Sequence, residues 1–127
     1  SGWTPSNPMQ IFSDSTLKKD ITAIDVDSIS SKLNRLNIYS YIYISDSAYN
    51  HNVKDLGLLA QDLEKLFPNC VYTNSSGIKT IDYARLIPIL IADSRKKDND
   101  IEELKKMVNQ LQNLFLQQQI LVEKSKK

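Results

Sequence analysis

The chain has 127 residues, which is enough for one modest domain with an extension. Its 16 basic and 15 acidic residues leave a net charge of +1, so the sequence carries no electrostatic footprint for nucleic acid. Hydrophobic residues make up 41%, but no apolar run reaches the about 18 residues that a membrane-spanning helix needs.

Cysteine and histidine, which form disulfides and are common zinc ligands, occur once each. One cysteine, Cys70, excludes an intrachain disulfide, and its place after Pro68 and Asn69 predicts a small buried filler at the entrance of a strand. The one histidine, His51, stands in a polar run, where we expect it to be solvated. We therefore expect neither a metal site nor a cofactor.

The first elements along the chain are short. Residues 1–12 contain two prolines and end in an apolar stretch, which predicts a linker with a short strand at its end. Residues 13–16, read Ser-Asp-Ser-Thr, have turn and N-cap chemistry. Apolar residues three and four apart then predict a helix over 26–36, capped by Asp25 or Asp27.

The middle of the chain alternates strand and helix signals. The aromatic and β-branched run over 39–44 predicts a strand, and residues 60–67 predict a short helix that Pro68 ends. Two short apolar runs, 71–73 and 78–81, flank a polar turn that contains glycine and predict a hairpin. The expected fold is α+β, with a small, partly antiparallel sheet and short helices.

A long helix is predicted from Tyr83 almost to the end, with Pro88 in its first turns, where a proline costs less than in the interior. Heptad a and d positions in its second half are held by Ile101, Leu104, Val108, Leu111, Phe115, Gln118 and Val122. When the heptad frame is extended backward, the polar Ser94 and Lys97 occupy the preceding a and d positions. They indicate a boundary between a helix packed on the domain and a free-standing one. We prefer self-association of this narrow stripe as a coiled coil; packing on the chain's own domain is the alternative.

Ser13 and Lys18 stand five residues apart across the predicted turn. A serine hydroxyl is a weak nucleophile that needs a base, and a lysine can be that base only as the neutral amine. Burial against apolar side chains such as Leu17 and Ile21, or a neighbouring cation such as Lys19, would favour the neutral form.

The bond most exposed to the Ser13 hydroxyl is the peptide bond between Phe12 and Ser13. Attack on the Phe12 carbonyl would shift the acyl group from nitrogen to oxygen and leave an ester for water, with backbone N–H groups of the turn holding the oxyanion. Asp14 would oppose this if it contacted Lys18, unless it orients the site or holds backbone N–H groups instead. Taken alone, the spacing is common, and its bland interpretation is an N-capped turn with a solvated lysine.

Four motifs follow one another along the chain. They read S-D-S-T-L-K-K-D-I at 13–21, Y-I-Y at 41–43, G-L-L-A-Q-D-L-E at 57–64 and K-T-I-D-Y at 79–83. In order and spacing they resemble the intramolecular chaperone auto-processing domain of the peptidase S74 family. This is the endosialidase-type C-terminal peptidase of phage tail spikes and tail fibres and of the myelin regulatory factor. The resemblance covers the chain from about residue 13 to its end.

The resemblance implies a homotrimer that helps to fold a preceding β-rich stem of the same polypeptide and then releases itself by cleavage. It implies a serine peptidase that acts once, in cis, with Ser13 as nucleophile, Lys18 as general base and the bond between Phe12 and Ser13 as the scissile bond. Positions that match the motifs and could support the site are Asp14, Gln61, Asp62, Asp82 and Tyr83. The alternative is a non-catalytic trimerisation or interaction module.

The expected organisation has three parts. Residues 1–12 end an upstream stem or linker, residues 13–97 form the auto-processing domain, and residues 98–127 form the C-terminal helix of a trimeric coiled coil. The bias toward Asn, Ile, Lys, Ser and Tyr suits an AT-rich, viral genome, with assembly of a virion tail or fibre in a host cytoplasm. We expect no nucleic-acid or membrane partner.

Overall fold

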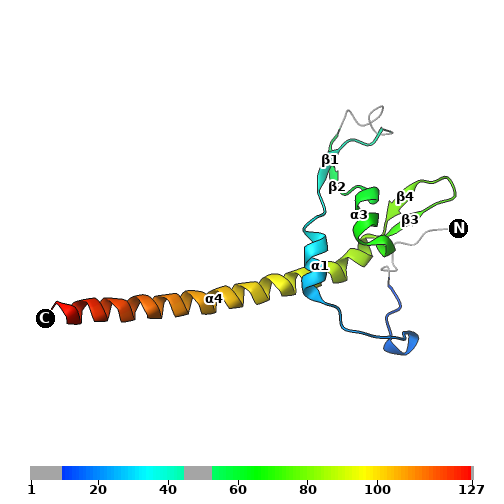
Figure 1. Cartoon of the computed structure of the whole chain (residues 1–127). Coiled ribbons are helices and arrows are strands. Elements are labelled where there is room, and N and C mark those ends of the chain that lie inside the picture. Colours follow the sequence, from blue (N-terminus) through cyan, green and yellow to red (C-terminus); the bar gives the residue numbers. More distant parts are fainter. Residues whose placement is uncertain (1–9, 45–52, 127) are drawn as a thin grey trace.

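The computed structural model describes residues 10–44 and 53–126. Residues 26–44 and 53–93 form a small head, and the rest of the long C-terminal helix projects from it (Figure 1). His51, expected to be solvated, lies outside the described residues. The elements in chain order are η1 (Ser15–Leu17), α1 (Val26–Leu33), β1 (Tyr39–Tyr41), β2 (Asp55–Gly57), α3 (Ala60–Leu66), η2 (Pro68–Cys70), β3 (Val71–Thr73), β4 (Lys79–Ile81), η3 (Tyr83–Arg85) and α4 (Leu86–Ser125). The predicted α+β class is confirmed.

Helix α1 forms where the apolar spacing placed it, although it ends three residues earlier than predicted. Its N-cap is Asp25, whose side chain accepts a 3.1 Å hydrogen bond from the backbone N–H of Asp27. Ile29 and Leu33 on one face pack against the core of the head. The repeat of apolar residues therefore predicted both the helix and the face that it buries.

The strands form two separate antiparallel pairs in place of the one sheet that we expected. Tyr39 lies opposite Gly57 in the β1–β2 pair, and Val71 lies opposite Ile81 in the β3–β4 pair. The antiparallel direction of the strands was predicted, but their division into two separate sheets was not. Whether two strand pairs join into one sheet depends on contacts between residues far apart in the sequence, which local patterns do not specify. The strand predicted over 39–44 is also shorter than expected.

The turn between β3 and β4 is built by two residues with special roles. The Asn74 side chain accepts 2.9 Å hydrogen bonds from the backbone N–H groups of Ser76 and Ile78. Gly77 has a φ of 81°, a conformation that side chains other than glycine rarely adopt. The predicted hairpin is therefore confirmed, together with the reason for its glycine.

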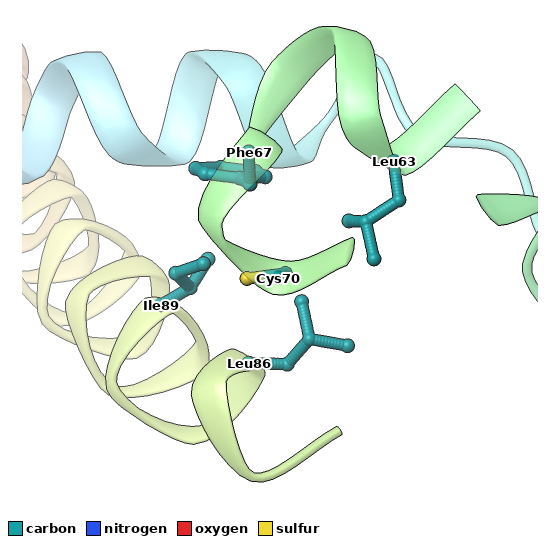
Figure 2. Packing of buried hydrophobic residues seen from close by; sticks show 5 residues of the cluster. All are labelled: Leu63, Phe67, Cys70, Leu86 and Ile89. Atoms are coloured by element: carbon teal, nitrogen blue, oxygen red, sulfur yellow. The ribbon is translucent and has the colours of Figure 1, made fainter. Parts of the chain in front are cut away.

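The core of the head lies between α3, η2 and the first turns of α4 (Figure 2). Its buried members are Leu63, Phe67, Cys70, Leu86 and Ile89. Cys70 is completely buried, as predicted for a small filler, and this burial raises the pKa of its thiol.

Helix α4 runs without a break for 40 residues. Pro88 is its third residue, where the missing N–H costs no helical hydrogen bond because the first N–H groups of a helix have no partner within it. Its buried side chains end at Asp93, and every described side chain from Ile101 onward is exposed. The change from packed to free-standing helix thus occurs without any interruption of the helix, and the domain boundary after residue 97 stays a prediction.

Polar contacts tie α1 to α4 where the two helices cross (Figure 1). Ser30 Oγ donates a 2.6 Å hydrogen bond to the carboxylate of Asp93, which also pairs with Lys97 one turn further along α4. Lys96 forms a second link, to Asp27 on α1, at 3.5 Å. The hydrogen bonds from Lys97 and from Ser30, in that order, lower the pKa of Asp93.

Candidate functional site

The chain folds back between Ser13 and Lys18 through the single 3-10 turn η1. The backbone N–H of Leu17 donates to the carbonyl of Asp14, and that of Lys18 donates to the carbonyl of Ser15, both at 3.1 Å. This reversal places the Ser13 and Lys18 side chains on the same side of the turn.

The amine and the hydroxyl are in direct contact. Lys18 Nζ donates a 2.7 Å hydrogen bond to Ser13 Oγ. The distance lies within the range over which a base can take a proton from a nucleophile. The five-residue spacing therefore brings both candidate catalytic groups together within one chain.

Asp14 caps this turn. Its Oδ1 atom accepts hydrogen bonds from the backbone N–H of Thr16 at 2.9 Å and from Thr16 Oγ1 at 2.8 Å. The bond from the backbone N–H is the larger cause, and the bond from the hydroxyl the second, of a lowered pKa for the Asp14 carboxyl. Of the roles left open by the sequence, the structure shows that Asp14 holds a backbone N–H group, and within the described ranges it forms no ion pair with Lys18.

The chain changes direction again just after the site. Asp20 has a φ of 54°, in the left-handed region that aspartate tolerates better than most residues. Its carbonyl accepts a 3.2 Å hydrogen bond from Thr22 Oγ1. This second turn leads the chain from the site toward α1.

The apolar side chains that we expected to dry the amine face solvent instead. Phe12 is 93% exposed, Leu17 68% and Ile21 70%. No residue from 10 to 25 is buried, and Figure 1 shows η1 at a distance from the strands and α3. The expectation that these side chains bury the amine is therefore wrong for the single chain, because among the described residues no strand or helix packs against this short segment.

Four residues that the motifs assigned a supporting role belong to the head, and no described hydrogen bond or ion pair joins them to Ser13 or Lys18. These residues are Gln61, Asp62, Asp82 and Tyr83. Asp82 caps η3 by accepting a 3.1 Å hydrogen bond from the N–H of Ala84, and it pairs with Arg85 at 3.2 Å. Its observed role is to cap η3, which leads directly into α4.

An aromatic hollow that the sequence did not predict lies on the head, and Gln61 and Tyr83 contribute to its lining. Tyr41 and Tyr43 meet there edge to face, with ring centroids 5.1 Å apart and hydroxyl oxygens 3.3 Å apart. The hydrogen bond with Tyr43 is the main cause that raises the pKa of Tyr41 to about 12. A Cβ at Gly57 would lie 2.9 Å from the Tyr41 hydroxyl, so the motif glycine leaves room for this ring.

The described residues include no group of three His, Cys, Asp or Glu side chains placed to hold a metal ion. Over the same residues, no helix combines the length and the apolar character needed to cross a membrane.

A family model described as chaperone of endosialidase, Peptidase_S74, matches residues 13–72 of the chain. Over these residues the chain is similar to the chaperone-of-endosialidase family. This confirms the resemblance for the three motifs within residues 13–72, supports a chaperone role, and marks the segment as peptidase-related, whereas the fourth motif, at 79–83, lies beyond the match. No curated protein matches the chain. The chaperone-of-endosialidase segment begins at Ser13 itself and contains the turn, α1, the β1–β2 pair and α3, whereas α4 lies beyond it.

Proposed function

We propose that this chain is a self-releasing intramolecular chaperone. It associates as a homotrimer along α4, assists the folding of a β-rich stem that precedes it, and cuts the bond between Phe12 and Ser13. The observation that carries the proposal is the 2.7 Å contact between Lys18 Nζ and Ser13 Oγ, placed at the first residue of the family match.

The chemistry is an acyl shift followed by hydrolysis. The Ser13 hydroxyl gives its proton to the neutral Lys18 amine, and Oγ bonds to the carbonyl carbon of Phe12. The carbon–nitrogen bond of the peptide breaks, and the Lys18 ammonium returns its proton to the nitrogen of Ser13. Water then hydrolyses the ester, which frees a carboxylate at Phe12 and restores the Ser13 hydroxyl.

The state of the lysine proton decides whether this reaction can start. An ammonium has three donors and no acceptor, so in the charged form Lys18 can only donate to Ser13, whereas the neutral amine accepts the hydroxyl proton across the same distance. Both groups are exposed in the single chain. Covering the turn in an assembly would favour the neutral amine, which makes cleavage dependent on association.

The free half of α4 offers the surface for that association. Its a and d side chains are about half to two-thirds exposed, and a second apolar stripe with a seven-residue spacing runs beside them, made of Met107, Leu114 and Leu121. The exposed apolar face is therefore wider than the narrow stripe predicted from the a and d positions alone. A face that combines a, d and a flanking position supports burial against more than one neighbouring helix.

Mass spectrometry of the intact chain, incubated at a series of concentrations, tests the proposal. We expect fragments 1–12 and 13–127, and a cleavage rate that rises with the fraction of chain in oligomers. Ser13→Ala and Lys18→Arg should abolish cutting, since alanine has no hydroxyl and a guanidinium stays protonated. Lys19→Arg, which keeps the neighbouring positive charge, and Ser15→Ala are matched controls and should cut normally. Cutting that persists in both dyad variants would rule the mechanism out.

A non-catalytic oligomerisation module is the second candidate, because the apolar face of α4 is exposed whatever happens at Ser13. It predicts a trimer in which the bond between Phe12 and Ser13 stays intact at every concentration. The same samples, analysed by sedimentation and by mass, separate the two functions.

A further inference from the structure

We infer that Asp14 is a positioning residue for the proposed cleavage: as the cap of η1 it fixes the turn that carries the Lys18 amine to Ser13, and it does so as a hydrogen-bond acceptor and not as a charge. This inference rests on the proposed function and assigns a role within its site.

The first support is that the site depends on local contacts. No side chain from 10 to 25 is buried, so packing does not hold the turn in place. What holds it, among the described residues, is the pair of backbone hydrogen bonds within η1 and the two bonds that Thr16 donates to Asp14. A long lysine side chain has many conformers, and only an ordered turn keeps its amine near one hydroxyl.

The second support is the way in which Asp14 uses its carboxylate. Both Thr16 donors go to the same atom, Oδ1, and that atom has an equivalent in the side-chain carbonyl oxygen of asparagine. Asparagine and aspartate cap helical turns about equally well. Capping therefore needs the oxygen but not the negative charge.

The third support is the absence of a link between Asp14 and Lys18 among the described ion pairs. A carboxylate in contact with the amine would favour the ammonium and oppose its action as a base. Thr16 donates both of its hydrogen bonds to Oδ1 of Asp14. The Lys18 amine instead forms its hydrogen bond with Ser13 Oγ. The lowered pKa of Asp14 agrees with a carboxylate held as an acceptor.

The test compares cleavage rates of the full chain as wild type, Asp14→Asn and Asp14→Ala, with Ser13→Ala as the zero. We expect Asp14→Asn to stay within about twofold of wild type and Asp14→Ala to be about fivefold to tenfold slower, the usual effect of losing a cap. Thr16→Val keeps the backbone donor and loses the hydroxyl donor, so it should fall between them.

The pH profile separates positioning from a charge effect. A capping role lowers the rate of Asp14→Ala equally at every pH and leaves the shape of the profile unchanged. A charge role would move the midpoint of the profile in Asp14→Ala and Asp14→Asn alike. A slow Asp14→Asn with a moved midpoint, or an Asp14→Ala that cuts as fast as wild type, would overturn the inference.

A second readout does not need cleavage. Nuclear Overhauser contacts between the Lys18 side chain and the Ser13 β-protons should be present in wild type and Asp14→Asn and lost in Asp14→Ala. If the wild type never cuts, the proposed function fails while these contacts still decide the role of Asp14. Equal contacts in all three proteins would refute that role, whatever the cleavage result.

Discussion

Ser30 on α1 and Asp93 on α4 are 63 positions apart in the sequence, yet a 2.6 Å hydrogen bond joins their side chains. Ser30 is 4% exposed and Asp93 8%, so the bond is shielded from water where the two helices cross. Helix α1 directly follows the segment that carries Ser13 and Lys18. This buried polar pair therefore attaches α1, the first helix after the candidate site, to α4.

Removing the Ser30 hydroxyl should weaken that anchor. We expect Ser30→Ala to lower the free energy of unfolding by about 1.5–3 kcal/mol, the range for a hydrogen bond to a charged group. Ser31→Ala is the matched control, because Ser31 is the exposed neighbour on the same helix and should change stability by less than about 0.5 kcal/mol. Urea unfolding at one fixed chain concentration measures both, and equal midpoints for the two variants would contradict the prediction.

Acid should release the contribution of Asp93. Its pKa is lowered from the ordinary value of 3.8, so its stabilisation is complete above that pH and is lost as pH falls through the lower, folded-state value. Stability should therefore decrease on acidification below about pH 4, with a smaller slope in Asp93→Asn, whose amide does not titrate in this range. Unfolding midpoints from pH 2 to 6 measure the two slopes. Identical slopes would show that Asp93 does not contribute to the acid sensitivity.

A charge at a heptad d position of α4 should break the proposed trimer. Leu111→Asp places a carboxylate at a d position. We expect the mass in solution to fall from that of a trimer, three times 14.5 kDa, toward the 14.5 kDa of a single chain. Asn113→Asp adds the same charge two residues further along, outside the apolar face, and should leave the trimer intact. Analytical ultracentrifugation distinguishes these states. A monomeric wild type, or an unaffected Leu111→Asp, would remove the coiled coil from the proposal.

The buried thiol provides a probe of the core. Cys70 is the one cysteine of the chain and is completely buried, so a disulfide reagent should modify the folded protein far more slowly than the urea-unfolded one. The raised pKa of the thiol slows the reaction further, because the thiolate is the reactive form. Rapid labelling of the native protein would place Cys70 outside the core.

The parts of the fold that could be predicted are those that depend on neighbours in the sequence. The cap by Asp25, the hairpin that closes at Gly77 and the contact between Ser13 and Lys18 each follow from a few adjacent residues. Their geometry is set by local hydrogen bonds and allowed backbone angles, which a short stretch of sequence specifies.

The parts that were missed depend on distant partners. Nothing near Ser30 indicates that its hydroxyl meets Asp93, and nothing near Tyr41 indicates that its ring needs the space at Gly57. The exposure of Leu17 was missed for a related reason: an apolar residue predicts burial, but whether its own chain or a second copy covers it depends on the whole assembly.

Because α4 is continuous, it fixes the rotation of the head about the helix axis relative to the exposed half of the helix. The α4 side chains that pack against α1 and the exposed a and d side chains lie on one helix, which is unbroken between Asp93 and Ile101. A single residue inserted between Asp100 and Ile101 would rotate the head by about 100° about the helix axis while preserving the contacts of α1 with Asp93 and Lys96. In the proposed trimer, the number of residues in this interval would thus set which side of each head faces the neighbouring copies.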